Sequence, residues 1–247
     1  MPSAGNVSVS FSYSAGKVFF SAWYVSDGRK IPANGTEVLL GASAYDSVSS
    51  CKVTVPSNGY ITVTAANIQD AYSVRMKATG FKDWEYLSSS NGFTANVGVK
   101  KGTYTISFKG AAVYSVKTTF HKVKETSAKS TKKKAASIKK GKLNKGIIPA
   151  NSRKKVHWYK IKNPKNQKIK LAVNAKKISG GGAYGKLKIT VYFPDKKSQS
   201  ANLYAGNSNE YSVTYGTIGT KKARKGTYYI KIVSSDGANG YYTLKWK

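Results

Sequence analysis

Hydrophobic and polar residues alternate with a period of two along most of the chain, and helical spacing is nearly absent. Strands with one buried face show this alternation, because successive side chains point to opposite sides of a sheet. Turn signals such as Asn58-Gly59, Lys101-Gly102 and Asp236-Gly237 separate the segments. The clearest strands are predicted at residues 7–13, 60–64, 187–191 and 228–232. Many short strands with regular turns predict an all-β sandwich fold.

A Lys-rich segment at residues 122–141 breaks this pattern. It consists mostly of Lys, Ser, Thr and Ala, so it offers little surface to bury and its charges repel one another. We interpret it as a flexible linker between two domains; a short helix of Ala and Lys is the alternative. The predicted organisation is a β-sandwich at 1–121 that includes extra N-terminal strands, a linker at 122–140 and a second β-sandwich at 141–247.

The chain repeats itself on the two sides of this segment. Residues 101–108 resemble residues 225–232, since both begin with Lys-Gly-Thr-Tyr and continue with alternating apolar residues. Upstream, five positions of the first copy recur 108 residues later: Val53, Pro56, Asn58, Ile61 and Val63 correspond to Ile161, Pro164, Asn166, Ile169 and Leu171. Two tandem copies of one sandwich explain the repeat better than one large domain. The second copy is longer, and we assign its extra residues to Gly- and Ser-rich stretches near 179–182 and 198–209.

The second copy resembles a known family. A strand that ends in Trp158-Tyr159-Lys160-Ile161, an Asn-Pro turn, residues 226–232 and a closing strand at 241–244 are similar to the bacterial pre-peptidase C-terminal domain family. That resemblance implies a jelly-roll-like β-sandwich of a secreted or cell-surface bacterial protein. Some members bind calcium through clustered acids. The acids of the second domain, Asp195, Glu210 and Asp236, do not cluster, so we predict neither a metal site nor a cofactor.

Positive charge is concentrated in the second half of the chain. The protein has 42 Lys and Arg against 10 Asp and Glu, a net charge of +32. Residues 1–121 hold 11 basic and 6 acidic residues, whereas residues 122–247 hold 31 basic and 4 acidic ones. Only Arg29, Arg75, Arg153 and Arg224 are arginines. Because Arg supplies the bidentate contacts that read bases, a Lys bias favours diffuse attraction to polyanions over sequence-specific nucleic-acid recognition.

Residue types that carry catalysis are scarce. The chain has one Cys and two His. Cys51 corresponds to Tyr159 of the second copy, on a face that we expect to point inward, so we interpret it as a buried thiol. Neither His121 nor His157 has an acidic partner nearby in sequence, and a nucleophile elbow is absent. The pair Asp83 and Glu85 could share a strand face, but a solvated loop is the simpler interpretation. We predict that the protein is not an enzyme. No apolar run approaches the ~20 residues of a spanning helix, so no membrane span is predicted.

Aromatic and Lys side chains alternate on the predicted outward faces. In the strand at 226–232, Tyr228, Ile230 and Ile232 share the inward face, which leaves Tyr229 and Lys231 outside. The same parity applied to the other strands of the second copy gives the candidate binding residues Trp158, Lys160, Lys162, Lys168, Lys170, Tyr229, Lys231, Tyr241 and Lys245. Such residues can contact sugar rings or polyanions. The alternative is that aromatics suit strands and Lys keeps the sheet soluble.

Three functions fit these patterns. The first is a non-catalytic module of a secreted or cell-surface bacterial protein that attaches to a cell-wall polymer, a glycan or the host extracellular matrix. The second is a structural spacer within a longer surface protein. The third is a non-specific binder of nucleic acid or another polyanion. We expect a monomer whose partners are polyanions, glycans or matrix proteins.

Overall fold

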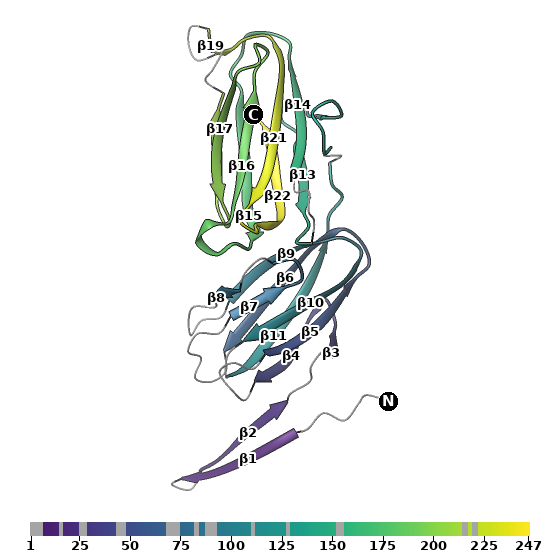
Figure 1. Cartoon of the computed structure of the whole chain (residues 1–247), viewed down its shortest axis with the longest axis vertical. Coiled ribbons are helices and arrows are strands. Elements are labelled where there is room, and N and C mark those ends of the chain that lie inside the picture. The colour runs from purple at the N-terminus through teal and green to yellow at the C-terminus, as the bar shows by residue number, and fades with distance from the viewer. Residues whose placement is uncertain are drawn as a thin grey trace.

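The computed structural model describes residues 7–14, 17–24, 29–42, 48–67, 75–81, 84–86, 93–109, 112–126, 129–151, 156–213, 217–218 and 222–247. Almost all of these residues lie in strands or turns, and they form two β-sandwiches that follow one another along the long axis of the molecule (Figure 1). The all-β fold predicted from the alternation and the two sandwiches predicted from the repeat are confirmed.

The first sandwich consists of two facing sheets. The five-stranded sheet has the order β3 (Arg29–Ile31), β5 (Val48–Val55), β10 (Gly102–Lys109), β7 (Arg75–Ala78) and β8 (Glu85–Tyr86). The four-stranded sheet has the order β4 (Asn34–Ala42), β11 (Ala112–Lys122), β6 (Gly59–Asn67) and β9 (Phe93–Val99). Strands β3 and β4 complete the two sheets at one edge. That the N-terminal region adds extra strands to the sandwich stays a prediction. Strands β1 (Val7–Ser14) and β2 (Lys17–Tyr24) form a separate two-stranded sheet.

The second sandwich repeats this plan strand for strand. Its five-stranded sheet, called the β14 sheet below, has the order β12 (Ala136–Ser137), β14 (Val156–Asn163), β21 (Gly226–Ser235), β16 (Lys186–Tyr192) and β17 (Ser198–Tyr204). Its four-stranded sheet, called the β22 sheet, has the order β13 (Leu143–Ile148), β22 (Asn239–Trp246), β15 (Lys170–Ser179) and β18 (Ser208–Ser212). A 3-10 turn, Gly182–Tyr184, follows β15, and β19 (Thr217–Ile218) pairs with β20 (Lys222–Ala223).

Details of pairing and packing support the duplication. The first strand of each five-stranded sheet pairs in parallel with the second, β3 with β5 and β12 with β14. In each unit a buried Tyr donates its hydroxyl to a carbonyl four residues earlier: Tyr104 to Lys100 at 3.1 Å, and Tyr228 to Arg224 at 2.9 Å. Cys51 and Tyr159 occupy equivalent buried positions, as the 108-residue offset predicts.

The extra residues of the second copy lie mostly elsewhere than the sequence suggested. Thirteen residues separate β18 from β21, whereas two separate β9 from β10. Most of the added length is therefore the segment that carries β19 and β20, not the stretches near 179–182 and 198–209. Turn residues gave no hint of this, because the segment itself contains short strands.

The Lys-rich segment contributes more to the second sandwich than a flexible linker would. Strand β12 extends the β14 sheet, and Ala135 and Ile138 are 6% and 4% exposed. Ile138 is part of the second hydrophobic core. One apolar side chain thus orders the end of a segment whose composition suggested disorder. Where the two units separate as folding domains stays a prediction.

The two sandwiches meet at the edge of the first four-stranded sheet. Gly98 of β9 donates its backbone N–H to Asn239 Oδ1 at 2.9 Å, and its carbonyl accepts the N–H of Ala150 at 2.8 Å. The N–H of Asn96 is bonded to Ser179 Oγ at 2.9 Å. A Cβ on Gly98 would lie 2.0 Å from the Ile148 carbonyl oxygen, so the close approach requires glycine. Backbone N–H and C=O groups of β9 that do not pair with β6 therefore form hydrogen bonds with the second sandwich.

Candidate functional site

Three neighbouring strands of the β14 sheet bring aromatic and Lys side chains together on its outer side. In the register of β14 with β21, Trp158 lies opposite Lys231 and Lys160 lies opposite Tyr229. On the other side of β21, Tyr192 of β16 lies opposite Tyr229. Buried residues such as Tyr159, which alternate with these, fill the core. The alternation that builds the sandwich therefore also builds this face.

The rings contact one another and are accompanied by ammonium groups. The ring centroids of Trp158 and Tyr192 are 5.4 Å apart, with planes tilted by 30°. Lys231 Nζ lies 5.6 Å from the Trp158 centroid, and Lys132 Nζ lies 4.9 Å from the centroids of both Tyr192 and Tyr229. All three rings keep partial exposure. We call this surface the aromatic face; its members are Trp158, Tyr192, Tyr229, Lys132, Lys160 and Lys231.

Lys132 reaches the aromatic face from the Lys-rich segment. The carbonyl of Lys129 accepts the backbone N–H of Trp158 at 2.8 Å. Further along, Ile138 N–H is bonded to the Lys160 carbonyl at 3.0 Å. Between these two anchors the chain turns, with Ala135 N–H bonded to the Lys132 carbonyl at 3.1 Å. The segment is thus held against the sheet before and after Lys132.

The structure divides the predicted binding residues between two sheets. Trp158, Lys160, Lys162, Tyr229 and Lys231 lie on the β14 sheet, on strands that pair directly. Lys170, Tyr241 and Lys245 lie on the β22 sheet, and exposed Lys168 lies just before β15. The sequence prediction missed two members of the aromatic face, Tyr192 and Lys132. Tyr192 follows Thr190 on the outward parity of its strand and could have been found; the place of Lys132 depends on how its segment folds back.

Tyr241 belongs to the junction between the sandwiches. Its ring stacks on Tyr60 of β6, with centroids 5.4 Å apart and planes at 9°. Tyr60 in turn stacks on His121 at 4.6 Å. Burial, together with the charge of Lys177, lowers the pKa of His121. Because its neighbour is an aromatic ring of the first sandwich, Tyr241 joins the two units and is separate from the aromatic face.

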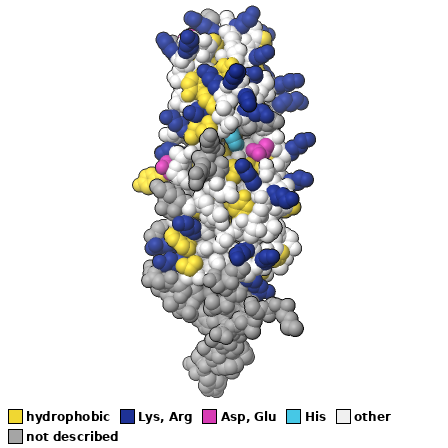
Figure 2. All heavy atoms as spheres, turned by 45° about the vertical axis from the view of Figure 1, so that its right-hand side comes forward, with side chains coloured by type: hydrophobic (Ala, Val, Ile, Leu, Met, Phe, Trp, Pro, Cys, Tyr) yellow, Lys and Arg dark blue, Asp and Glu magenta, His cyan; other side chains and the backbone are white. Residues whose placement is uncertain are grey.

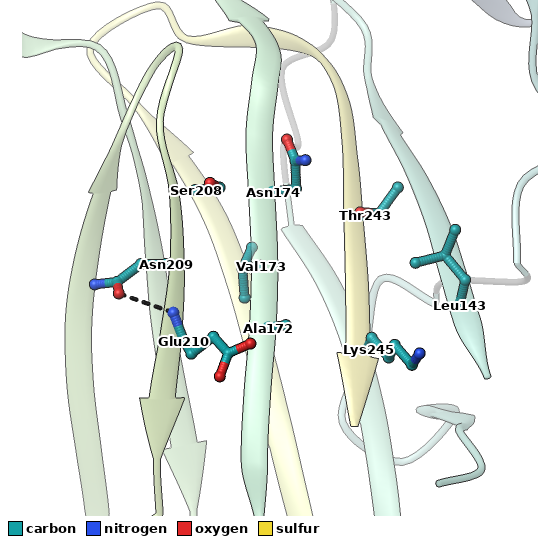
Figure 3. A pocket seen from close by; sticks show the side chains of 9 residues that line it. All are labelled: Leu143, Ala172, Val173, Asn174, Ser208, Asn209, Glu210, Thr243 and Lys245. Atoms are coloured by element: carbon teal, nitrogen blue, oxygen red, sulfur yellow. Dashed lines mark hydrogen bonds between the residues drawn. The ribbon is translucent and has the colours of Figure 1, made fainter. Parts of the chain in front are cut away.

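A shallow pocket of about 460 Å³ lies on the β22 sheet (Figure 3). Its floor includes Ala172 and Thr243, and polar side chains such as Asn174, Glu210 and Lys245 surround it. Asn209 Oδ1 accepts the backbone N–H of Glu210 at 2.8 Å, and the Glu210 carboxylate pairs with Lys247. The pocket has both a carboxylate and an ammonium group, whereas the aromatic face has cations alone.

Cys51 and His157, two of the residues considered for catalysis, are largely buried among other side chains. Burial raises the pKa of the Cys51 thiol to about 12, so it is not a thiolate at neutral pH. Burial lowers the pKa of His157 to about 4, and its Nδ1 lies 2.6 Å from the hydroxyl of Tyr242, which is 2.8 Å from the Tyr159 hydroxyl. Asp83 lies outside the described residues, and its partner Glu85 is in β8.

Within the described part of the chain, no three His, Cys, Asp or Glu side chains gather as metal ligands would. None of its helices has the length and apolarity to cross a membrane.

Comparison with known proteins places the chain in no family. No family model and no curated protein match it. Among solved structures, the CUB1-EGF-CUB2 domain of human MASP-1/3 is 9% identical with a TM-score of 0.27, covering 85% of this chain and 99% of that one. The tandem CBM22-1-CBM22-2 domain of Paenibacillus barcinonensis Xyn10C is 10% identical with a TM-score of 0.23, covering 98% and 91%. Likeness this remote carries no argument, so the sandwich assignment rests on the sheets and cores described above.

Proposed function

We propose that the chain is a non-catalytic binding module whose aromatic face attaches to a polymer that carries negative charge. The observation that supports this most directly is the cluster of Trp158, Tyr192 and Tyr229 with Lys132 and Lys231 on paired strands. Rings on a flat sheet offer their faces to sugar rings, and the ammonium groups attract anions.

Long-range charge supports the same function. Residues 122–247 hold 31 basic and 4 acidic residues. Figure 2 shows Lys and Arg side chains over much of the described surface on one side, with hydrophobic side chains between them and few acids. Such a field concentrates polyanions near the protein, and its effect falls as salt screens it over a Debye length of about 8 Å at physiological ionic strength.

The source of the protein is part of this proposal. The strand motif around Trp158–Ile161 and the Gly226–Ile232 strand resemble bacterial pre-peptidase C-terminal domains, which favours a secreted or cell-surface bacterial protein. In that location the module can bind a cell-wall polymer, a glycan or the host matrix.

The test is binding of the whole chain to immobilised heparin, teichoic acid and duplex DNA at low salt and at about 0.15 M salt. Replacing Trp158 or Tyr229 by Ala should each weaken binding by on the order of 1–3 kcal/mol, by analogy with base stacking, and the loss should persist at the higher salt. Tyr184→Ala is the matched control, because Tyr184 is 74% exposed and lies on the 3-10 turn away from the face. Equal losses in all three variants would contradict the proposal.

A structural spacer is the second candidate, and the junction is the observation in its favour. Backbone groups of Gly98 and Asn96 are bonded to the second sandwich, and Tyr60 stacks on Tyr241. These contacts fix the relative position of the two units, as a rigid stalk requires. A spacer binds none of the three polymers beyond what net charge gives, so replacement of Trp158 would leave affinity unchanged.

A further inference from the structure

The aromatic face is already in contact with a cation from the same chain. Lys132 Nζ lies 4.9 Å from the centroids of Tyr192 and Tyr229, so a single ammonium group covers two rings that a ligand would use. Lys231 covers Trp158 in the same way at 5.6 Å. Among the described residues, no Asp or Glu forms an ion pair with Lys132.

The backbone keeps Lys132 close to these rings. Lys129 and Ile138 are hydrogen-bonded to β14 on either side of it, and Ile138 is buried in the core of the second sandwich. Lys132 therefore starts from a fixed place on the edge of the sheet. Its neighbour Lys133 is exposed, carries the same charge and makes no ring contact with a described residue.

We infer that Lys132 makes the aromatic face selective for anionic polysaccharides over neutral ones. The inference rests on the proposed function and names the ligand class of that same site. Lys132 is the residue that determines specificity, while the rings provide the surface on which sugars stack.

The selectivity follows from what each ligand does to the ammonium group. A neutral sugar that stacks on Tyr192 or Tyr229 must displace Lys132 and forfeits its cation–π attraction, which costs binding free energy. A sugar that carries sulfate or carboxylate offers Lys132 a charge-assisted hydrogen bond in exchange. The displaced cation then adds to the affinity instead of opposing it.

The arrangement of the rings favours a polysaccharide over a nucleic acid. Single-stranded nucleic acids stack successive bases on a row of separate aromatic side chains along a groove. Here the rings of Trp158, Tyr192 and Tyr229 converge on one patch of three adjacent strands, which serves one or two rings of a polymer. The rest of the ligand must then be attracted by the lysines around this patch, which suits a polysaccharide with charged groups along its length.

The experiment compares Lys132→Gln with Lys133→Gln in the full chain, using dextran sulfate and unsulfated dextran of equal length as probes at about 0.15 M salt. Lys132→Gln should weaken dextran sulfate binding about tenfold and Lys133→Gln about twofold, because both lose one charge and only the first loses a group at the rings. Dextran binding should be unchanged or tighter in Lys132→Gln. The ratio of the dextran sulfate affinity to the dextran affinity therefore falls about tenfold or more in Lys132→Gln and only about twofold in Lys133→Gln.

Equal effects of the two substitutions would overturn the role of Lys132. The proposed function would still stand if Trp158→Ala weakened binding of either dextran probe, whereas no effect of Trp158→Ala on any probe would overturn both. Single-stranded oligothymidylate provides the third probe. If it binds more tightly than dextran sulfate and depends on Trp158, the ligand class is nucleic acid and the assignment to polysaccharides is wrong.

Discussion

The two sandwiches have the same strand order but different outer faces. The positions of Trp158 and Tyr229 are held in the first sandwich by Ser50 and Thr105, which lie at equivalent places on β5 and β10. Thr79 stands next to Thr105 where Tyr192 stands next to Tyr229. The outer face of the first sandwich therefore carries small hydroxyl side chains at the places where the second carries rings.

Hydroxyl groups on the outer face of the first sandwich form hydrogen bonds within their own sheet. Thr79 Oγ1 accepts the backbone N–H of Thr105 at 2.8 Å, and the hydroxyls of Thr54 and Thr103 are 2.9 Å apart. Since one copy of the fold forms with Ser and Thr at these positions, the fold itself does not require Trp and Tyr there. The core residues therefore specify the sandwich, whereas the outer residues of the second copy are available for binding.

Replacement of the aromatic residues by their counterparts from the first sandwich should have the largest effect on affinity for an anionic polymer. The triple change Trp158→Ser, Tyr192→Thr and Tyr229→Thr should reduce affinity for an anionic polymer by about a hundredfold or more, since each ring contributes on the order of 1–3 kcal/mol. Thermal unfolding should change little, because the replaced side chains are outside the core. Affinity measured by calorimetry together with melting curves checks both parts. A chain that loses stability and affinity together would show that the rings are structural.

Acid should destabilise the second sandwich through His157, for which the first has Ser49. The folded pKa of His157 is about 4 and the unfolded value is 6.5, so the unfolded chain takes up a proton below pH 6.5 that the native state refuses until about pH 4. Stability should therefore fall by about 3 kcal/mol as pH drops from 6.5 to 4 and level off below. Denaturant unfolding across this range measures the loss.

His157→Gln isolates the contribution of that side chain. The variant should lack the loss of stability in acid that we expect of the native chain. The difference between the two curves of stability against pH measures the contribution of His157. Burial raises the pKa of Glu125, which accepts the Ile147 N–H at 2.9 Å, so protonation of Glu125 acts in the opposite direction in both proteins. Parallel curves for the variant and the native chain would contradict the assignment.

Transfer of the rings to the first sandwich should have a smaller effect. In a chain whose second face carries the triple exchange, Ser50→Trp, Thr79→Tyr and Thr105→Tyr should restore binding by less than about threefold. The first half has 11 basic and 6 acidic residues, so the field that attracts an anionic polymer is weaker there. Recovery of full affinity would show that rings alone make the site and that charge is incidental.

Cleavage of the Lys-rich segment that connects the two sandwiches should have the smallest effect, because the two sandwiches should stay associated. Trypsin should cut first at the exposed Lys132–Lys134 run, yet the fragments should stay together, because Gly98 and Ala150 bond across the junction and Ala150 packs into the first core. Native size-exclusion chromatography should show no change, and denaturing electrophoresis should show two fragments. Separation of the fragments under native conditions would show that the junction holds the units weakly.

Alternation predicted most of the fold and four of the six members of the aromatic face. The parity of Trp158 and Tyr229 assigned both side chains to the outside, and the repeat placed Cys51 in a core. Parity cannot show which strands are neighbours, so Tyr241 was grouped with residues of the other sheet. Lys132 was beyond prediction, because its place depends on hydrogen bonds of Lys129 and Ile138 to a strand more than twenty residues away.

The contact at Gly98 determines what would happen to the first sandwich on its own. Strand β9 is the edge of its sheet, and its outward N–H and C=O groups form hydrogen bonds with Asn239, Ser179 and Ala150. Deleting the second sandwich would leave an unprotected strand edge, which is a template for pairing with another copy. In the full chain the second sandwich covers this edge, so truncated versions that end before residue 141 should self-associate.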